Sequence, residues 1–261
     1  MVQVAAAAVD VTNFITTSNA SSEAFKTATL LKTLSVNALI MGEEGVGKKS
    51  LASFILPSAS IVDASHFDEL LVALKSVDEI IITNIDNSPN IKRLIDIINA
   101  DSIRVIATSK QSFSNEYIDE IFSVKFDIPP IKERMQDVEP LVRKFTMEAS
   151  LLFGGDEKFN IENFKPDLSQ NADSLRRQVM ISYLLQDVKD FELMDIIENY
   201  LYSKMGTNSD YRNLIYIYEV PLIRAGLKKF KSQLQLSDKL GLNRNTLRKK
   251  IAENKQYLKD N

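Results

Sequence analysis

The stretch that constrains this chain most is NALIMGEEGVGKKSLASFI, residues 37–55, in which a short apolar run, a glycine-rich turn and the start of a helical pattern follow one another. Gly42, Gly47 and Lys48 fit the spacing Gly-x4-Gly-Lys, and Gly45 lies inside the loop. Glycines let backbone N–H groups converge on phosphate oxygens, the helix start adds positive potential, and the lysine can reach the outer phosphates. The stretch therefore predicts a phosphate-binding loop.

Val46 and Lys49 are also expected to bind the nucleotide, together with the glycines and Lys48. Val46 lies within the loop, and Lys49 follows the loop lysine. Most loops of this kind place Ser or Thr after the lysine, where the hydroxyl binds magnesium. We therefore expect the loop to bind the phosphates of ATP, and no metal ligand is assigned. The alternative is a glycine-rich turn that precedes a lysine without binding a ligand.

Apolar runs alternate with helical patterns over the first half of the chain. The runs NALIMG, ASIVDA, EIIITNID and SIRVIATS are separated by segments such as FDELLVALKSV and NIKRLIDIINA. This alternation predicts an α/β fold with a parallel sheet and crossover helices. The two prolines of DIPPIKER end the pattern, and the sequence after them is expected to be helical.

Composition and charge limit the kinds of function. The chain has no cysteine and one histidine, His66, which excludes disulfides, thiolate nucleophiles and sites that need two histidines. No apolar run approaches the ~20 residues of a membrane helix, and no signal-peptide pattern is present, so we expect a cytoplasmic protein without a membrane partner. Residues 219–261 hold 11 Lys and Arg against 4 Asp and Glu, a net charge of +7. Because the whole chain has a net charge of −3, residues 1–218 carry −10. This asymmetry predicts a polyanionic partner at the C-terminal end.

The C-terminal segment LKKFKSQLQLSDKLGLNRNTLRKKI predicts a helix-turn-helix. A short helix from about Gln235 to Leu240 is followed by a turn at Gly241 and by a second helix capped by Asn243. Four leucines are expected to supply its small core: Leu236, Leu240, Leu242 and Leu247.

The second helix of this pair carries residues suited to double-stranded DNA. The first residues of such a helix enter the major groove, where Arg can pair with guanine and Asn with adenine, and later basic residues contact phosphates. Base or near-base contacts are expected from Asn243, Arg244, Asn245 and Thr246, and phosphate contacts from Arg248, Lys249 and Lys250. The alternative is a solvated basic helix that closes a helical bundle.

Taken in order, these segments resemble the NtrC-type bacterial enhancer-binding regulators. GEEGVGKK is similar to the family's GESGTGKE loop, IPPIKER to its LPPLRER segment, and GLNRNTLRKKI to the recognition helix of its Fis-like DNA-binding domain. The resemblance implies a degenerate AAA+ P-loop subdomain at residues 1–132, a helical lid at 133–207 and an all-α Fis-type helix-turn-helix domain at 208–261. It also implies pairing of two chains through residues 214–231.

The same resemblance implies nucleotide contacts outside the loop. Arg176, in DSLRRQV, matches the lid arginine of the family's GNVREL motif, and Thr108 and Ser109 match its polar sensor position. The alternatives are an ordinary exposed arginine and ordinary strand-end hydroxyls.

Several catalytic motifs of the family are missing. TNIDNSP replaces a DEIGDMP-like turn, so that Thr83 and Asn84 stand where two acids would hold magnesium and orient water. FSNEYIDEI has Ser114 and Glu120 in place of the arginine fingers, and no GAFTGA motif, which engages sigma-54, occurs. We therefore expect no catalytic residues, no appreciable ATP hydrolysis and no remodelling of sigma-54.

The sequence thus predicts a sequence-specific DNA-binding transcription regulator, a homodimer or larger homo-oligomer, whose AAA+ domain binds ATP or only oligomerises. Two alternatives stay open. One is a slow ATPase that recruits Asp86 or Glu79 as a substitute carboxylate. The other is an accessory protein that modulates another AAA+ regulator and uses DNA as an anchor.

Overall fold

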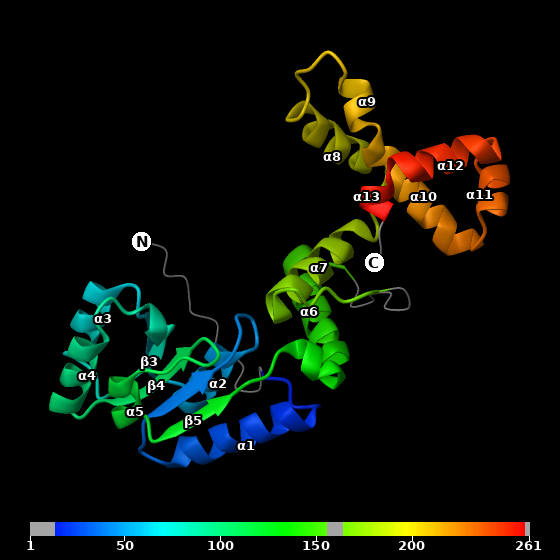
Figure 1. Ribbon diagram of the computed structural model, residues 1–261. Coiled ribbons are helices and arrows are strands. Elements are labelled where there is room, and N and C mark those ends of the chain that lie inside the picture. Colours follow the sequence, from blue (N-terminus) through cyan, green and yellow to red (C-terminus); the bar gives the residue numbers. More distant parts are fainter. Residues whose placement is uncertain (1–13, 156–163, 259–261) are drawn as a thin grey trace. The chain divides into compact units, whose positions relative to one another are not determined.

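The computed structural model describes residues 14–155 and 164–258, which form two compact units that divide after Asp187 (Figure 1). The predicted division into three domains, after residues 132 and 207, stays a prediction. Within the described ranges, no helix combines the length and the apolar character needed to cross a bilayer.

The first unit alternates strands and helices and ends in two longer helices. Its elements are α1 (Asn19–Thr33), β1 (Ala38–Met41), α2 (Lys48–Ile55), β2 (Ser60–Asp63), α3 (Phe67–Leu74), β3 (Glu79–Thr83), η1 (Ile85–Asn87), α4 (Ile91–Ala100), β4 (Arg104–Ser109), α5 (Glu116–Ile121), β5 (Val124–Asp127), η2 (Ile131–Glu133), η3 (Met135–Asp137), α6 (Val138–Phe153) and α7 (Asn171–Leu185).

Five parallel strands form one sheet in the order β2-β3-β4-β1-β5. β1 lies between β4 and β5, with Ile40 opposite Thr108 and Phe126. The predicted parallel α/β sheet is confirmed. Because all strands run the same way, their carboxyl ends share one edge, and the crevice beyond such an edge is where α/β sheets bind ligands.

The edge strand β5 is not among the four predicted strands. Its residues VKFD alternate between partly buried and exposed side chains, whereas β3 and β4 are almost continuously buried. Strands covered on both faces read as continuous apolar runs, and an edge strand does not need to. The pattern of β5 is therefore too polar to be found before its neighbour β1 is known.

Helices cover both faces of the sheet (Figure 1). α3, α4 and α5 contribute to the core on one face, together with Ile80 and Ile82, whereas α1 and α2 pack on the other with Ile81. All three isoleucines are fully buried, because successive side chains of β3 point to opposite faces and both faces are covered.

The helices α6 and α7 form a pair beside the loop that follows β1. Phe145, Leu175 and Val179 belong to their shared core. The first turn of α7 lies on the loop itself, since the Ala172 N–H donates to the Gly45 carbonyl at 3.1 Å. Two segments more than a hundred residues apart in sequence therefore meet at the predicted phosphate loop.

The second unit is helical in the part of it that the structure describes. Its helices are α8 (Asp190–Tyr202), α9 (Asp210–Leu214), α10 (Tyr216–Phe230), α11 (Gln233–Lys239), α12 (Arg244–Glu253) and α13 (Lys255–Leu258). The turn between α11 and α12 contains Gly241 at φ +63°, a left-handed conformation that favours glycine. Asn243 caps α12 by accepting the Asn245 N–H at 2.9 Å, as the sequence predicts.

The core of the second unit is small. Ile223 of α10, Leu236 of α11 and Leu247 of α12 are its buried members, and Leu240 packs against them. The fourth predicted leucine, Leu242, is partly exposed and lies outside this core. Among the residues that the structure describes, only three side chains of this core are fully buried, and partly buried neighbours such as Phe230 and Ile251 pack around them.

We expect Leu236→Ala to destabilise the second unit by ~2–5 kcal/mol, because it opens a cavity in a core of few residues. Faster hydrogen exchange of the α10–α12 amides in the full chain would measure the loss. Leu234→Ala is the matched control, since Leu234 lies on the same helix but is 52% exposed. Equal exchange rates in the two variants would contradict this assignment of the core.

Candidate functional sites

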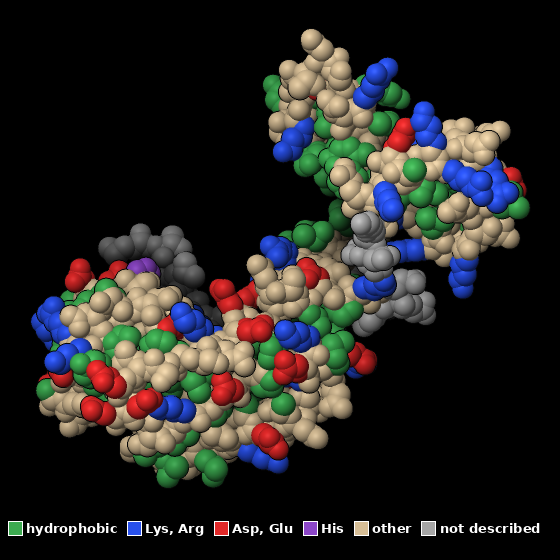
Figure 2. All heavy atoms as spheres, in the orientation of Figure 1, with side chains coloured by type: hydrophobic (Ala, Val, Ile, Leu, Met, Phe, Trp, Pro, Cys, Tyr) green, Lys and Arg blue, Asp and Glu red, His purple; other side chains and the backbone are tan. Residues whose placement is uncertain are grey.

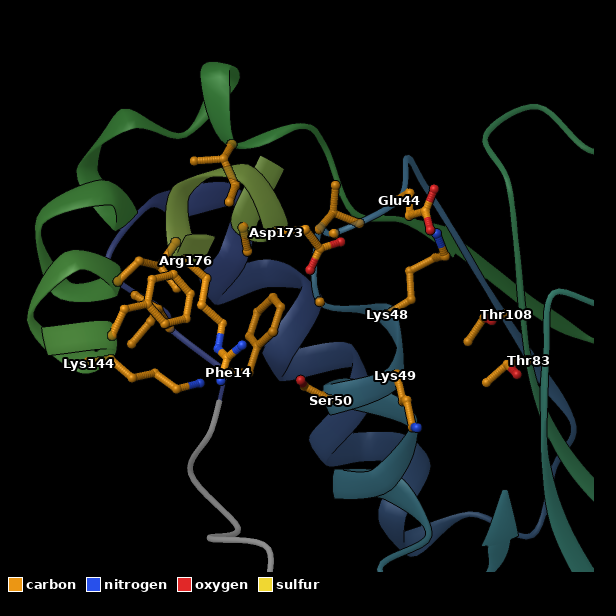
Figure 3. A pocket seen from close by; sticks show the side chains of 18 of the residues that line it. Phe14, Glu44, Lys48, Lys49, Ser50, Thr83, Thr108, Lys144, Asp173 and Arg176 are labelled. Carbon is orange, nitrogen blue, oxygen red and sulfur yellow. The ribbon is translucent and has the colours of Figure 1, made fainter. Parts of the chain in front are cut away.

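A cleft of about 540 Å³ lies beside the predicted phosphate loop in the first unit (Figure 3). The structure brings most of the predicted nucleotide-binding residues together around it: Gly45, Val46, Gly47, Lys48, Lys49 and Arg176 line the cleft. Thr83, Asn84 and Thr108, from the ends of two strands, line it as well. Gly42 begins the loop, and Ser109 is buried outside the lining.

The loop backbone requires glycine where α2 begins. Gly47 has φ +105°, a left-handed conformation that other residues rarely adopt. A Cβ at this position would also lie 2.9 Å from Cε2 of the Phe14 ring. The second glycine of the motif is therefore explained by its backbone and by its neighbour.

Lys48 folds back onto the start of its own loop. Its ammonium donates to the carbonyls of Gly42 and Glu43, each at 2.7 Å. Burial lowers the pKa of Lys48, and the nearby acids, Asp86 first among them, oppose this shift. The lysine thus holds the loop in shape and keeps a cationic group within the cleft.

The next three carbonyls of the loop are held from other parts of the chain. The Asn171 side chain donates to the Glu44 carbonyl at 2.9 Å, and the Ala172 N–H to that of Gly45. Nη2 of Arg134 donates to the Val46 carbonyl at 2.6 Å. Every carbonyl from Gly42 to Val46 therefore has a donor.

The amides of the loop are in the opposite situation. Among the hydrogen bonds between described residues, none has the N–H of Glu44, Gly45, Val46 or Gly47 as donor. Successive unpaired N–H groups at a helix start make an anion site. With its carbonyls occupied and its amides available, the loop is arranged to accept phosphate oxygens.

A buried ion pair anchors the group that holds Val46. Arg134 and Asp137 have side chains only 3% and 0% exposed, and their charged groups are 3.1 Å apart. Asp137 also accepts from the backbone N–H of Ser18 at 2.7 Å and from the hydroxyls of Ser18 and Ser21 at 3.1 Å. Burial lowers the pKa of Arg134, and Asp137 opposes this shift. The network ties the start of α1 and the IPPIKER segment to the loop.

Apolar side chains line another part of the cleft. Phe14, Ile15, Ile131, Leu141 and Phe145 are in its lining. A wall of this kind beside a phosphate-binding loop suits a ligand with a flat ring and a charged tail.

Arg176, the predicted lid contact, points toward Phe14 and Lys144 (Figure 3). Its Nε donates to Glu148 at 2.8 Å. The arginine thus lines the cleft but already has a carboxylate partner, and its contact with a nucleotide stays a prediction.

The carboxyl end of β3 presents neutral side chains to the cleft, and Asp63 at the end of β2 lines the cleft beside them. The Thr83 hydroxyl and the Asn84 amide donate to Asp63 Oδ2 at 3.1 and 2.7 Å. Partial burial opposes ionisation of Asp63, but hydrogen bonds from Ser65, Asn84 and Thr83 outweigh it, and the pKa of Asp63 lies below its ordinary value. Asp63 was not predicted as a site residue; the only signal in the sequence is an acid at the end of the run ASIVD.

The two acids considered as substitutes for the missing pair have other partners. Asp86 accepts from the Lys110 N–H at 3.2 Å and lies 3.5 Å from the Lys110 ammonium. Glu79 opens β3 and pairs with Arg104, which opens β4, at 3.6 Å. The interpretation of Glu79 as a substitute carboxylate is wrong, because it lies at the end of β3 opposite to the cleft.

The other residues named from the sequence lie on the surface of the first unit. Ser114 and Glu120 are exposed, in and just before α5. His66 occupies the position before α3 without a capping hydrogen bond from its side chain.

Comparisons with known proteins rest on structure alone. No family model matches the sequence, and no curated protein matches it. NtrX from Brucella abortus is a similar solved structure. Its complex with ADP has a TM-score of 0.60 at 15% identity, covering 94% of this chain and 69% of NtrX, and its complex with ATP a TM-score of 0.53 at 16% identity, covering 92% and 69%. The fold is AAA+-like. A further NtrX structure agrees, with a TM-score of 0.59 at 15% identity over 92% of this chain.

On α12 of the second unit, the residues predicted to contact bases are all exposed: Asn243, Arg244, Asn245 and Thr246. Arg248 and Lys249 are exposed too, and Lys249 lies 3.8 Å from Glu253. Lys250 differs, since its ammonium is hydrogen-bonded to Glu219 of α10. Lys250 therefore fastens α12 to α10 as the structure stands.

We expect Asp137→Ala to destabilise the first unit by ~3–5 kcal/mol, because it leaves the Arg134 guanidinium buried without its partner. Faster hydrogen exchange of the β1 and β4 amides in the full chain would report this loss. Glu139→Ala is the control, since its pair with Arg143 is 64–70% exposed and worth less than ~1 kcal/mol. A loss for Asp137→Ala no larger than that of the control would refute the anchoring role.

Proposed function

We propose that this chain is a sequence-specific DNA-binding transcription regulator whose AAA+-like unit binds an adenine nucleotide without hydrolysing it. The observation that carries the proposal is the exposed start of α12, where Asn243, Arg244, Asn245 and Thr246 follow one another. Leu247 is the one buried side chain of this helix. Structural likeness to NtrX supports the AAA+-like part. The Fis-type assignment of the helix-turn-helix rests on the residues of GLNRNTLRKK.

Charge supports DNA as the partner of the second unit. The visible face of α10–α12 carries Lys and Arg with few acids, whereas both signs are mixed over the first unit (Figure 2). Phosphate contacts supply most of the affinity of such a surface, and side chains at the helix start supply the choice of sequence. Arg244, exposed in the first turn of α12, is the residue expected to read a base.

An apolar surface supports self-association of the second unit. A groove of about 710 Å³ between α8, α9 and α10 is lined by side chains such as Leu193, Ile197 and Leu222. α8 has no buried residue among its 13, so its apolar side chains are left to water within the single chain. Two copies joined here or along α10 would present two α12 helices to a palindromic site.

The cleft supports binding without hydrolysis. Phosphate transfer to water needs a carboxylate that holds magnesium and a base that orients the water. Thr83 and Asn84 stand at the end of β3, where the expected acids are missing. Asp63, which also lines the cleft, accepts four hydrogen bonds from Ser65, Thr83 and Asn84. The slow-ATPase alternative therefore depends on Asp86 leaving Lys110.

We expect Arg244→Ala to weaken binding to a selected palindromic site by ~1–3 kcal/mol and to relax the preference for one base pair. Binding selected from random duplexes gives the site, and titration at one fixed salt concentration gives both affinities. Arg212→Ala on α9 removes the same charge from the same unit and is expected to have little effect. If the two variants bind alike, α12 is not the recognition helix.

We expect Lys48→Ala to weaken binding of labelled ATP and ADP by ~1.5–3 kcal/mol, because the ammonium is the loop's charged hydrogen-bond donor. Lys75→Ala, at the exposed end of α3, serves as the control. Phosphate release from ATP is expected at background in the wild type and in both variants. A turnover above background that disappears with Lys48→Ala would overturn the proposal of an inactive site and favour the slow ATPase.

The accessory-protein alternative differs in its partner. It requires stable association with another AAA+ regulator, whereas the proposal above requires only DNA and a second copy. Sedimentation of the purified chain with and without its DNA site separates the two, since the proposed regulator saturates DNA as a homo-oligomer without any added protein.

A further inference from the structure

An acidic group from α7 lies close to the middle of the phosphate loop. A Cβ built at Gly45 would lie 2.8 Å from Oδ2 of Asp173 and 2.6 Å from the carbonyl of Gln170. Gly45 has φ +74° and no side chain, so the carboxylate approaches the loop backbone itself. Asp173 lines the cleft together with Gly45, Gly47 and Lys48, and Figure 3 shows it beside the loop.

The first turn of α7 holds this carboxylate in place. Asn171 is buried with φ +51°, and its side chain accepts the Ile131 N–H at 2.8 Å while donating to the Glu44 carbonyl. The Ala172 N–H is bound to the Gly45 carbonyl. The two residues before Asp173 are thus fastened to the loop, and the carboxylate cannot leave without breaking these bonds or turning its own side chain away.

Two arginines follow Asp173 on α7, and both have other partners. Arg176 lies beside Phe14 and Lys144 and is bound to Glu148 (Figure 3), and Arg177 donates to Gln170 Oε1 at 3.1 Å. Lys48 is the loop's own cation, and the charge of Asp173 is one of those that act on it, together with Glu43 and Glu44. A ligand's phosphates would therefore meet an acid where α7 approaches the loop.

We propose that Asp173 makes the cleft prefer nucleoside diphosphates to triphosphates. This inference rests on the proposed nucleotide binding and names the residue that decides which nucleotide is bound. The free loop amides attract phosphate, but a carboxylate placed beside Gly45 repels it, and the repulsion increases with the charge of the ligand. ATP carries one more negative charge than ADP and therefore loses more affinity.

Calorimetric titration of the full chain with ATP and with ADP, in buffer containing EDTA, tests the proposal. The wild type is expected to bind ADP more tightly than ATP. Asp173→Asn, which keeps the shape and removes the charge, is expected to raise the affinity for ATP by about tenfold and that for ADP by less. Asp173→Glu retains the charge and is expected to retain the preference for ADP.

Asp96→Asn is the matched control, because it removes the same charge from an exposed position on α4 and is expected to leave both affinities unchanged. An unchanged ratio of ATP to ADP affinity in Asp173→Asn, with binding intact, overturns the role of Asp173 and leaves the proposed nucleotide site standing. If neither nucleotide binds to the wild type or to any variant, the nucleotide site itself is overturned, and the selectivity with it.

Discussion

The first unit depends on the hydrogen-bond donors that hold the carbonyls of the predicted phosphate loop. Five consecutive carbonyls, from Gly42 to Val46, accept hydrogen bonds from Lys48, Asn171, Ala172 and Arg134. A backbone N–H points roughly opposite to the carbonyl of the same peptide unit, so fixing one fixes the other. The shape of the proposed anion site is thus set largely by Asn171, Ala172 and Arg134, which lie outside the loop. Arg134 can serve this way only because Asp137 compensates its charge in a buried position.

In this cleft, the groups suited to binding a phosphate are distinct from those that hydrolysis would require. The amides and the lysine ammonium remain at the loop, whereas the end of β3 offers a hydroxyl and an amide whose hydrogens point to Asp63. An ionised carboxylate that accepts four protein hydrogen bonds is well satisfied without a metal ion. Thr83 and Asn84, which replace the expected acids, therefore also hydrogen-bond to Asp63, the acid that could have taken over their role. Binding and hydrolysis require different groups, and the first set is far better represented in this cleft.

Much of the fold follows from the sequence, because it is recorded in local patterns. The four predicted strands appear in the sequence as apolar runs, the loop is marked by its glycines, and the cap of α12 is marked by Asn243. What could not be read depends on contacts between distant segments. β5 is defined by its pairing with β1, and Asp63 faces the cleft only because β2 lies beside β3. Asp173 is similar: its charge is visible in the sequence, but its place over Gly45 follows from hydrogen bonds between α7 and the loop.

The alignment of α7 with the family's GNVREL motif also depends on such contacts between distant segments. When the arginine of the family's GNVREL motif is matched within DSLRRQV, it falls at Arg176. The segment QNADSL gives a second alignment, in which the buried residues Asn171 and Leu175 match the Asn and Leu of GNVREL. In that register the arginine's place is taken by Asp173, the residue that lies over the loop. In the proposed regulator, which binds nucleotide without hydrolysing it, the chain can change state only through the difference in nucleotide affinity between its states. An acid where α7 meets the loop makes that difference depend on phosphate charge, and the proposed site then discriminates against a triphosphate.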